Sequence, residues 1–246
     1  MKEAQKKQSR REGETKAKRL LFLLFGVLIT LSVVHISLQY ININLLSEEQ
    51  GSFYELTNRF DFDDEASIPT WVAQLLFLLI SGVAFLLFYL EKEKAKKAIW
   101  PIVAVVALLG SLDEVATLHE NLLQSIHLLF YDESTPTALA NAWILIVPFV
   151  LVVTLVFARK AKATLPKKTL KLLITALALY VTGAIFIDIF TSSYVTNIGF
   201  MGQGIMVAVE EVLELAGLSI ALYAIVDYTE VKFSNNLMRA KKELLK

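Results

Sequence analysis

Residues 71–90, WVAQLLFLLISGVAFLLFYL, decide the fold class of this chain. The segment contains no charged side chain, and an α-helix of this length extends about 30 Å, the thickness of the hydrocarbon core of a bilayer. Similar apolar stretches recur along the 246-residue sequence, of which 55% is hydrophobic. The sequence therefore predicts an all-α, polytopic membrane helical bundle rather than a soluble domain.

Six segments are apolar and long enough to be transmembrane helices. They are residues 20–40, 71–90, 98–118, 138–158, 170–190 and 204–226. We therefore expect one membrane domain over residues 20–226, with a basic tail at 1–19 before it. A cytoplasmic amphipathic tail at 227–246 is expected to follow, as a simple anchor in preference to an interfacial basic helix. The second span has few polar residues and is expected to face lipid.

The basic residues predict the orientation of these spans. Of the 24 Lys and Arg residues, 23 fall in the two tails or beside the connections from the second to the third span and from the fourth to the fifth. Only Arg59 lies in the outer loop 41–70, together with seven acidic residues. Because cytoplasmic loops are enriched in Lys and Arg, both termini are predicted to be cytoplasmic. We expect a bacterial or archaeal cytoplasmic (plasma) membrane protein, surrounded by the lipid bilayer, with no nucleic-acid partner.

Seven acidic residues lie within the apolar segments, and no Lys or Arg occurs in residues 98–158 or 172–231. They are Asp113, Glu114, Glu120, Asp188, Glu210, Glu211 and Glu214. An ionised carboxylate at the bilayer centre costs roughly 3 kcal/mol, so seven would cost on the order of 20 kcal/mol, more than a typical fold stability. These acids therefore require water, shared protons or a bound cation.

The acids are expected to converge near the outer surface. At about 1.5 Å per residue, the acids of the third, fifth and sixth spans all fall in the outer half of the membrane, as does His35 of the first. If the third span continues as one helix to about Phe130, Asp113 and Glu120 share one face of it. Four spans would then bring ionisable groups to one outward-facing layer.

We predict that a divalent cation binds in this layer. The predicted ligands are Glu114, Glu120, Glu210, Glu211 and Glu214, and the accessory groups are Asp113, Asp188, His35 and His119. Oxygen ligands with at most one or two imidazoles suit Mn, Fe, Mg or Ca, and the ion is left open. The sequence contains no cysteine, which excludes thiolate ligands and disulfides. The acidic run 61–65 lacks the glycine of a calcium loop and is interpreted as solvated.

Two motifs carry a resemblance to other proteins. Ser-Leu-Asp-Glu…His-Glu at 111–120 and Glu-Glu-x-x-Glu at 210–214 resemble segments of uncharacterised prokaryotic multi-pass membrane proteins. The resemblance covers these two segments and implies no activity.

Three functions remain open at this stage. The first is cation binding for transport or sensing. The second is a metalloenzyme whose cation activates water toward a lipid or periplasmic substrate, with a carboxylate as general base. The third is a proton-linked carrier or a metal-free assembly subunit. The inner halves of the spans offer few polar groups, which favours a one-sided site over transport through the membrane.

Overall fold

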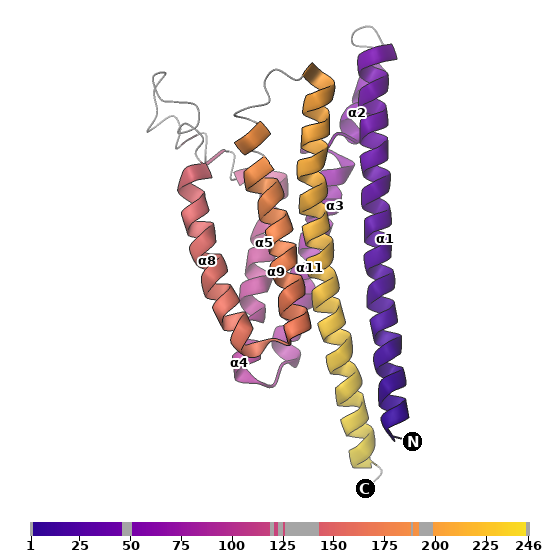
Figure 1. Cartoon of the computed structure of the whole chain (residues 1–246), viewed down its shortest axis with the longest axis vertical. Helices are drawn as coiled ribbons and strands as arrows, with labels where there is room; N and C mark the ends of the chain where they lie inside the picture. The colour runs from indigo at the N-terminus through magenta and orange to yellow at the C-terminus, as the bar shows by residue number, and fades with distance from the viewer. Residues whose placement is uncertain are drawn as a thin grey trace.

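The computed structural model describes residues 2–45, 51–118, 121–122, 125, 143–187, 189–191 and 199–244. In these residues the chain forms helices and no strand (Figure 1). The long helices are α1 (Lys2–Leu45), α3 (Ile68–Leu90), α5 (Trp100–Ala116), α8 (Trp143–Thr164), α9 (Lys167–Val181) and α11 (Gly199–Leu244). The shorter elements are α2 (Gly51–Arg59), α4 (Lys94–Lys97) and the π-helical segment η1 (Thr182–Ile187). The predicted all-α fold is confirmed.

Several of these helices have the length and composition of membrane spans. Within the described parts of the chain, four segments qualify, namely Lys16–Ile43, Ile68–Leu90, Lys94–Ala116 and Lys167–Thr191. Each of the six predicted spans also overlaps a long helix, because α8 has 22 residues and α11 has 46. The structure is that of a helical bundle of the membrane type.

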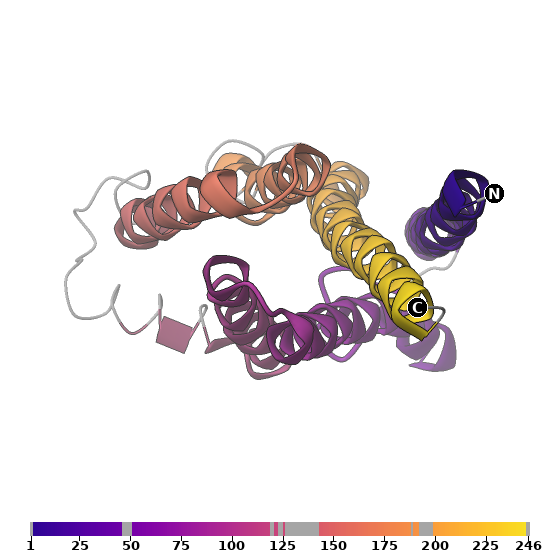
Figure 2. The same cartoon turned by 90° about the horizontal axis from the view of Figure 1, so that it is seen from below.

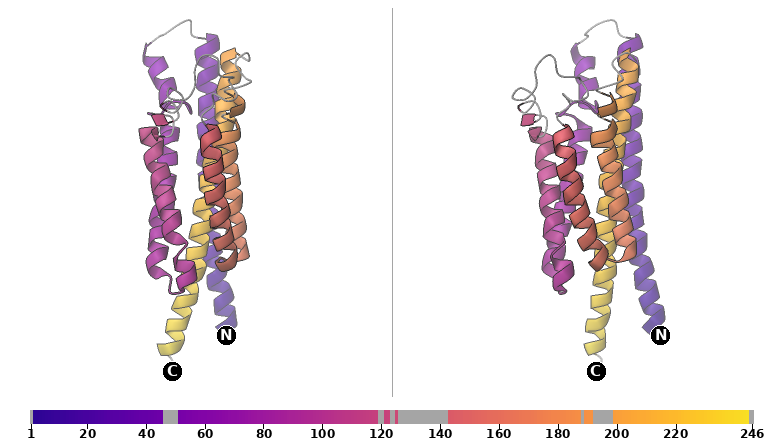
Figure 3. Two further views of the ribbon diagram at one scale, coloured as in Figure 1. Left: turned by 90° about the vertical axis from the view of Figure 1, so that its left-hand side faces the viewer. Right: turned by 60° about the vertical axis from the view of Figure 1, so that its left-hand side comes forward.

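The two ends of the chain lie at the same end of the bundle (Figure 1). The connections from α3 to α5 and from α8 to α9 lie at this end as well, as Figure 3 shows from the side. We call it the basic end, because the described segments that hold 22 of the 24 Lys and Arg residues, 2–19, 91–97, 159–171 and 227–244, are located there. The opposite end, where α2 lies, is called the outer end.

Helix α11 is the central element of the bundle. It packs against α1, α3, α9 and η1, whereas α5 packs mainly on α3. Seen from below, α3, α4 and α5 form one side of the bundle, and α8 and α9 form the other (Figure 2). Leu31 of α1, Leu76 of α3 and Leu215 of α11 are buried in the core.

Helix α3 buries one of its faces in the bundle, which its uniformly apolar sequence did not reveal. It buries Ala73, Leu76, Phe77, Ile80, Ala84 and Leu87. Its neighbours α5 and α11 cover this face. Its other face exposes Trp71, Leu79 and Phe85, as expected of a helix that contacts lipid. Buried and lipid-facing positions are both apolar, so the sequence alone cannot tell the two faces apart.

One predicted helix boundary also needs correction, at the end of the third span. Helix α5 ends at Ala116, and Thr117 adopts the left-handed conformation with φ of 45° and ψ of 42°, so the third span does not run straight to Phe130. The Asn121 side chain donates hydrogen bonds to the Thr117 carbonyl and hydroxyl, both at 2.9 Å, across this break. Helix α11 continues unbroken to Leu244, so residues 227–244 of the expected cytoplasmic tail continue the helix of the sixth span.

Candidate functional site

The acidic motifs of α5 and α11 lie close enough to interact. The negative charges of Glu114, Glu210 and Asp63 act on Glu211, and those of Glu211, Glu114 and Glu210 act on Glu214. Glu114 comes from α5, whereas the other glutamates come from successive turns of α11. The structure therefore brings together four of the five predicted ligands. We call this group, with Asp63, the acidic site.

Tyr180 of α9 is a member of the acidic site that the sequence did not reveal. Its hydroxyl donates a hydrogen bond to Glu214, and the charges of Glu114 and Glu211 also act on it. Its ring packs edge-on against Phe77 of α3, with ring centroids 5.6 Å apart. A tyrosine in an apolar span gives no periodic signal, so only the packing of α9 beside α11 identifies its role.

Glycines allow α9 and η1 to approach the backbone of α11 beside the acids. A Cβ atom at Gly183 would lie 2.6 Å from the Glu210 carbonyl oxygen and 2.8 Å from Glu214 Cγ. A Cβ atom at Gly217 would lie 2.7 Å from the Ala176 carbonyl oxygen. Close approach through glycine is typical of packed membrane helices, and π-helical turns are frequent at functional sites. The acids of α11 are thus fixed against η1.

The segment 60–67, which we call the outer strap, belongs to the surroundings of the acidic site. Asp63 is exposed, yet its charge acts on Glu211. Its backbone N–H donates to Asp61 Oδ1 at 3.1 Å, which fixes the local turn. The interpretation of residues 61–65 as a merely solvated loop was therefore incomplete.

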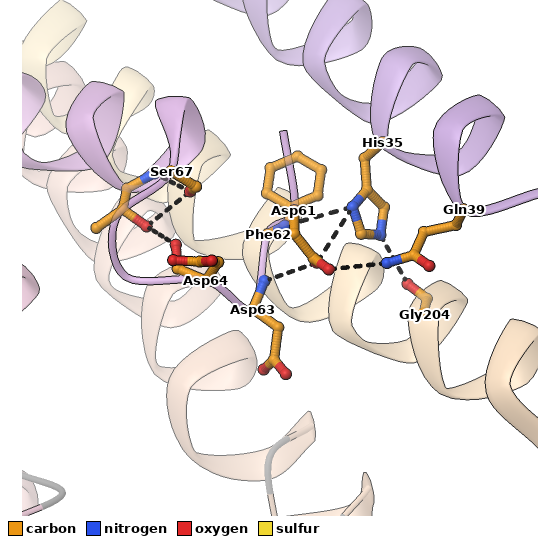
Figure 4. Close-up of polar contacts among 9 residues, drawn as sticks. His35, Gln39, Asp61, Phe62, Asp63, Asp64, Ser67 and Gly204 are labelled. Atoms are coloured by element: carbon orange, nitrogen blue, oxygen red, sulfur yellow. Dashed lines mark hydrogen bonds and ion pairs between the residues drawn. The ribbon is translucent and has the colours of Figure 1, made fainter. Parts of the chain in front are cut away.

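His35 joins the outer strap to two helices (Figure 4). The Phe62 N–H donates to Nδ1 at 3.3 Å, so the proton of a neutral ring is on Nε2, which lies 3.3 Å from the Gly204 carbonyl oxygen of α11. The ring is 1% exposed and lies 5.0 Å from the Phe62 ring. Both ring nitrogens of His35 therefore have protein partners, and Asp61 Oδ1 also lies 3.5 Å from Nδ1.

The acids do not form a recognisable metal centre. In the ranges that the structure describes, no group of three or more His, Asp or Glu residues is arranged to hold a metal ion. Asp113 is partly buried on the same turn as Glu114. The predicted residues Glu120, His119 and Asp188 lie outside the described residues.

Buried acids at the basic end are paired with lysine. By contrast, residues 98–158 and 172–231, which include the four glutamates of the acidic site, contain no Lys or Arg. Glu91 is buried after α3 and accepts hydrogen bonds from the Tyr228 hydroxyl at 2.8 Å, from Lys232 and from the Glu93 N–H at 3.2 Å. Burial raises the pKa of Glu91, but these donors lower it more, so the pKa lies below its ordinary value. Asp227 is buried as well, and Lys168 Nζ lies 2.7 Å from its Oδ1.

Comparison with known proteins identifies a family but no function. No curated protein and no solved structure matches the chain significantly. A family model described as "Domain of unknown function (DUF8692)" matches residues 20–228. This range includes both acidic motifs, Tyr180 and the outer strap. The chain therefore belongs to the family described as domain of unknown function DUF8692.

Proposed function

We propose that this protein is a six-span protein of a prokaryotic cytoplasmic membrane and that its outward-facing acidic site binds a divalent cation as part of a sensor. Both termini are cytoplasmic in this proposal. The orientation is supported by the gathering of the basic segments at one end of the bundle, since Lys and Arg are enriched on the cytoplasmic side.

One observation carries the cation proposal. Glu114 of α5 and Glu211 and Glu214 of α11 interact electrostatically, while residues 98–158 and 172–231 contain no Lys or Arg. Carboxylates this close cannot all remain ionised in an apolar bundle unless a positive charge compensates them. Residues 98–158 and 172–231 supply no such side chain. Carboxylate oxygens are the ligands that hard divalent cations prefer.

The part of the bundle between the acidic site and the basic end favours sensing over transport. Toward the basic end, α11 buries Leu218, Leu222 and Ile225 in the core. At that end, the buried Glu91 and Asp227 are each paired with a lysine. An ion would have to cross this apolar layer to be transported, whereas a sensor needs access from one side only.

The proposal is tested by melting the purified protein with Mg²⁺, Ca²⁺, Mn²⁺, Fe²⁺ and Zn²⁺ added singly, together with elemental analysis. One ion should raise the melting temperature, because a ligand present at 100 times its Kd stabilises a fold by about 2.7 kcal/mol. Glu211→Gln should remove the shift. Glu93→Gln, which neutralises an exposed acid at the basic end, should keep it. If no ion shifts the melting temperature and none is found bound, the cation proposal is wrong.

A second candidate is a site neutralised by protons alone, in a proton-linked carrier or an assembly subunit. It is favoured by the hydrogen bond between Tyr180 and Glu214 and by the lack of ligand geometry among the described residues. In this case the melting temperature would depend on pH but not on any divalent ion. Infrared spectra would show protonated carboxyl groups that disappear in the Glu211→Gln and Glu214→Gln variants.

A further inference from the structure

We propose that His35 is a latch that holds the outer strap closed over the acidic site, and that release of the strap is the step that admits the cation. The latch itself depends only on the contacts of His35. Its role in admitting a cation rests on the proposed function.

The latch fastens the strap to two helices at once. His35 comes from α1, accepts the Phe62 N–H of the strap and donates to the Gly204 carbonyl of α11. One turn further along α1, Gln39 Nε2 donates to Asp61 Oδ2 at 2.8 Å. Figure 4 shows His35 and Gln39 of α1 contacting residues 61 and 62, with Gly204 of α11 on the other side of the imidazole. The buried Phe62 ring packs beside the imidazole and completes the attachment.

Further hydrogen bonds hold the two ends of the strap: Arg59 Nη1 of α2 donates to the Ala66 carbonyl at 3.2 Å, and others lie at the start of α3. Ser67 caps α3 by accepting the Thr70 N–H at 3.3 Å, and the Thr70 hydroxyl donates to the Asp64 carbonyl at 3.0 Å. The Asp64 side chain accepts the Ala66 N–H at 2.7 Å. These bonds can persist when residues 61–63 move. The strap can therefore open at the latch without unfolding α3.

The position of Asp63 connects the strap to the acidic site. Its side chain extends away from the His35 contacts in Figure 4, and its charge acts on Glu211. If Glu211 ionises without a cation, Asp63 repels it, and the latch opposes this repulsion. A bound cation would attract both acids and keep the strap closed. Opening of the latch would expose the site, and cation binding would close it again.

Hydrogen–deuterium exchange of the strap amides in lipid nanodiscs tests the latch directly, because the Phe62 N–H is itself a latch bond. In His35→Leu, exchange of residues 61–63 should be about tenfold faster, as expected when hydrogen bonds that hold a local segment are lost. His35→Asn keeps an acceptor near the position of Nδ1 and should restore part of the protection. Gln39→Leu, which leaves the buried ring intact, should accelerate exchange to a smaller extent.

The control is Ser32→Ala, because the Ser32 hydroxyl bonds only within α1, to the Leu28 carbonyl. It should leave exchange of the strap unchanged. If the strap of His35→Leu and Gln39→Leu exchanges at the wild-type rate, or if His35→Asn gives no more protection than His35→Leu, the latch is refuted.

The cation arm uses Mg²⁺, Ca²⁺ and Mn²⁺ added singly to the wild type and to Asp63→Asn. The ion that raises the melting temperature should slow strap exchange in the wild type but not in Asp63→Asn. An ion that stabilises the protein without changing strap exchange would refute the gating role and leave the proposed function standing. If no ion stabilises the protein, the proposed function and the gating role both fail, and the His35 variants still decide the latch.

Discussion

Individual acidic residues of this chain differ in how their charge is compensated. At the basic end, Glu91 forms an ion pair with Lys232 and accepts a hydrogen bond from the Tyr228 hydroxyl. Glu211, in contrast, is surrounded by the charges of other acids. Removing a carboxylate should therefore have opposite consequences at the two places: it breaks a pair at Glu91 and relieves repulsion at Glu211.

Glu91→Gln should destabilise the protein by about 3 kcal/mol, because it leaves a lysine without its buried partner. Glu93→Gln is the matched control, since its pair with Lys96 is exposed and should contribute less than about 1 kcal/mol. Chemical unfolding in detergent measures both. If the two substitutions lower the free energy of unfolding equally, the buried Glu91–Lys232 pair contributes no more stability than the exposed Glu93–Lys96 pair.

The same variant predicts a pH dependence. The pKa of Glu91 is lower in the folded protein than its ordinary value of 4.5, so the pair stabilises the fold above that pH. This stabilisation is lost as the pH falls through the lowered pKa. The difference in melting temperature between wild type and Glu91→Gln should be constant above pH 6 and shrink toward pH 3. A difference that grows on acidification would contradict the assignment.

If the proposed site is correct, Glu114→Gln and Glu211→Gln should each weaken cation binding by about tenfold, and the double variant should be clearly non-additive, because both carboxylates would contact one ion. Calorimetric titration of the four proteins with the stabilising ion gives the coupling energy. Strictly additive effects would assign the two glutamates to separate sites.

At the scale of elements, the sequence predicts the long helices but not their breaks. Runs of apolar residues indicate where α3, α9 and α11 lie, because exposing each of these side chains to water costs free energy and the costs add up along the run. The left-handed Thr117 has no such signal, since neither Gly nor Pro marks it. Asp63 and Tyr180 were missed for a related reason. Each joins the site because segments distant in sequence pack together. The hydrophobic periodicity of a single helix gives no information about such packing.

Gly183→Ala should separate η1 from α11 and destabilise the protein by about 2 kcal/mol, because the added methyl group meets the backbone of α11. Gly82→Ala is the control: nothing lies within 4 Å of a Cβ atom there, so it should be neutral or slightly stabilising. Thermal melting compares the two. A neutral Gly183→Ala would mean that the helices can move apart freely.

At the scale of the whole molecule, the separation of charge predicts the topology. The chain has no cysteine, so single cysteines can be introduced without background. Cysteines replacing Ser9 and Lys160 should be protected from an impermeant thiol reagent added to intact cells, whereas one replacing Ser52 should react. The reverse pattern would place the acidic site on the cytoplasmic side of the membrane.

The glycine contacts divide the bundle into two helix pairs. Gly110 of α5 lies against the Phe77 ring of α3, as Gly217 of α11 lies against the backbone of α9. Glu91 and Lys232 join the pairs at the basic end, while Glu114 and Glu211 interact across them nearer the outer end. Ionised acids would therefore spread the outer ends of the two pairs, and neutralised acids would let them approach. The width of the bundle at its outer end would then report whether the site is occupied.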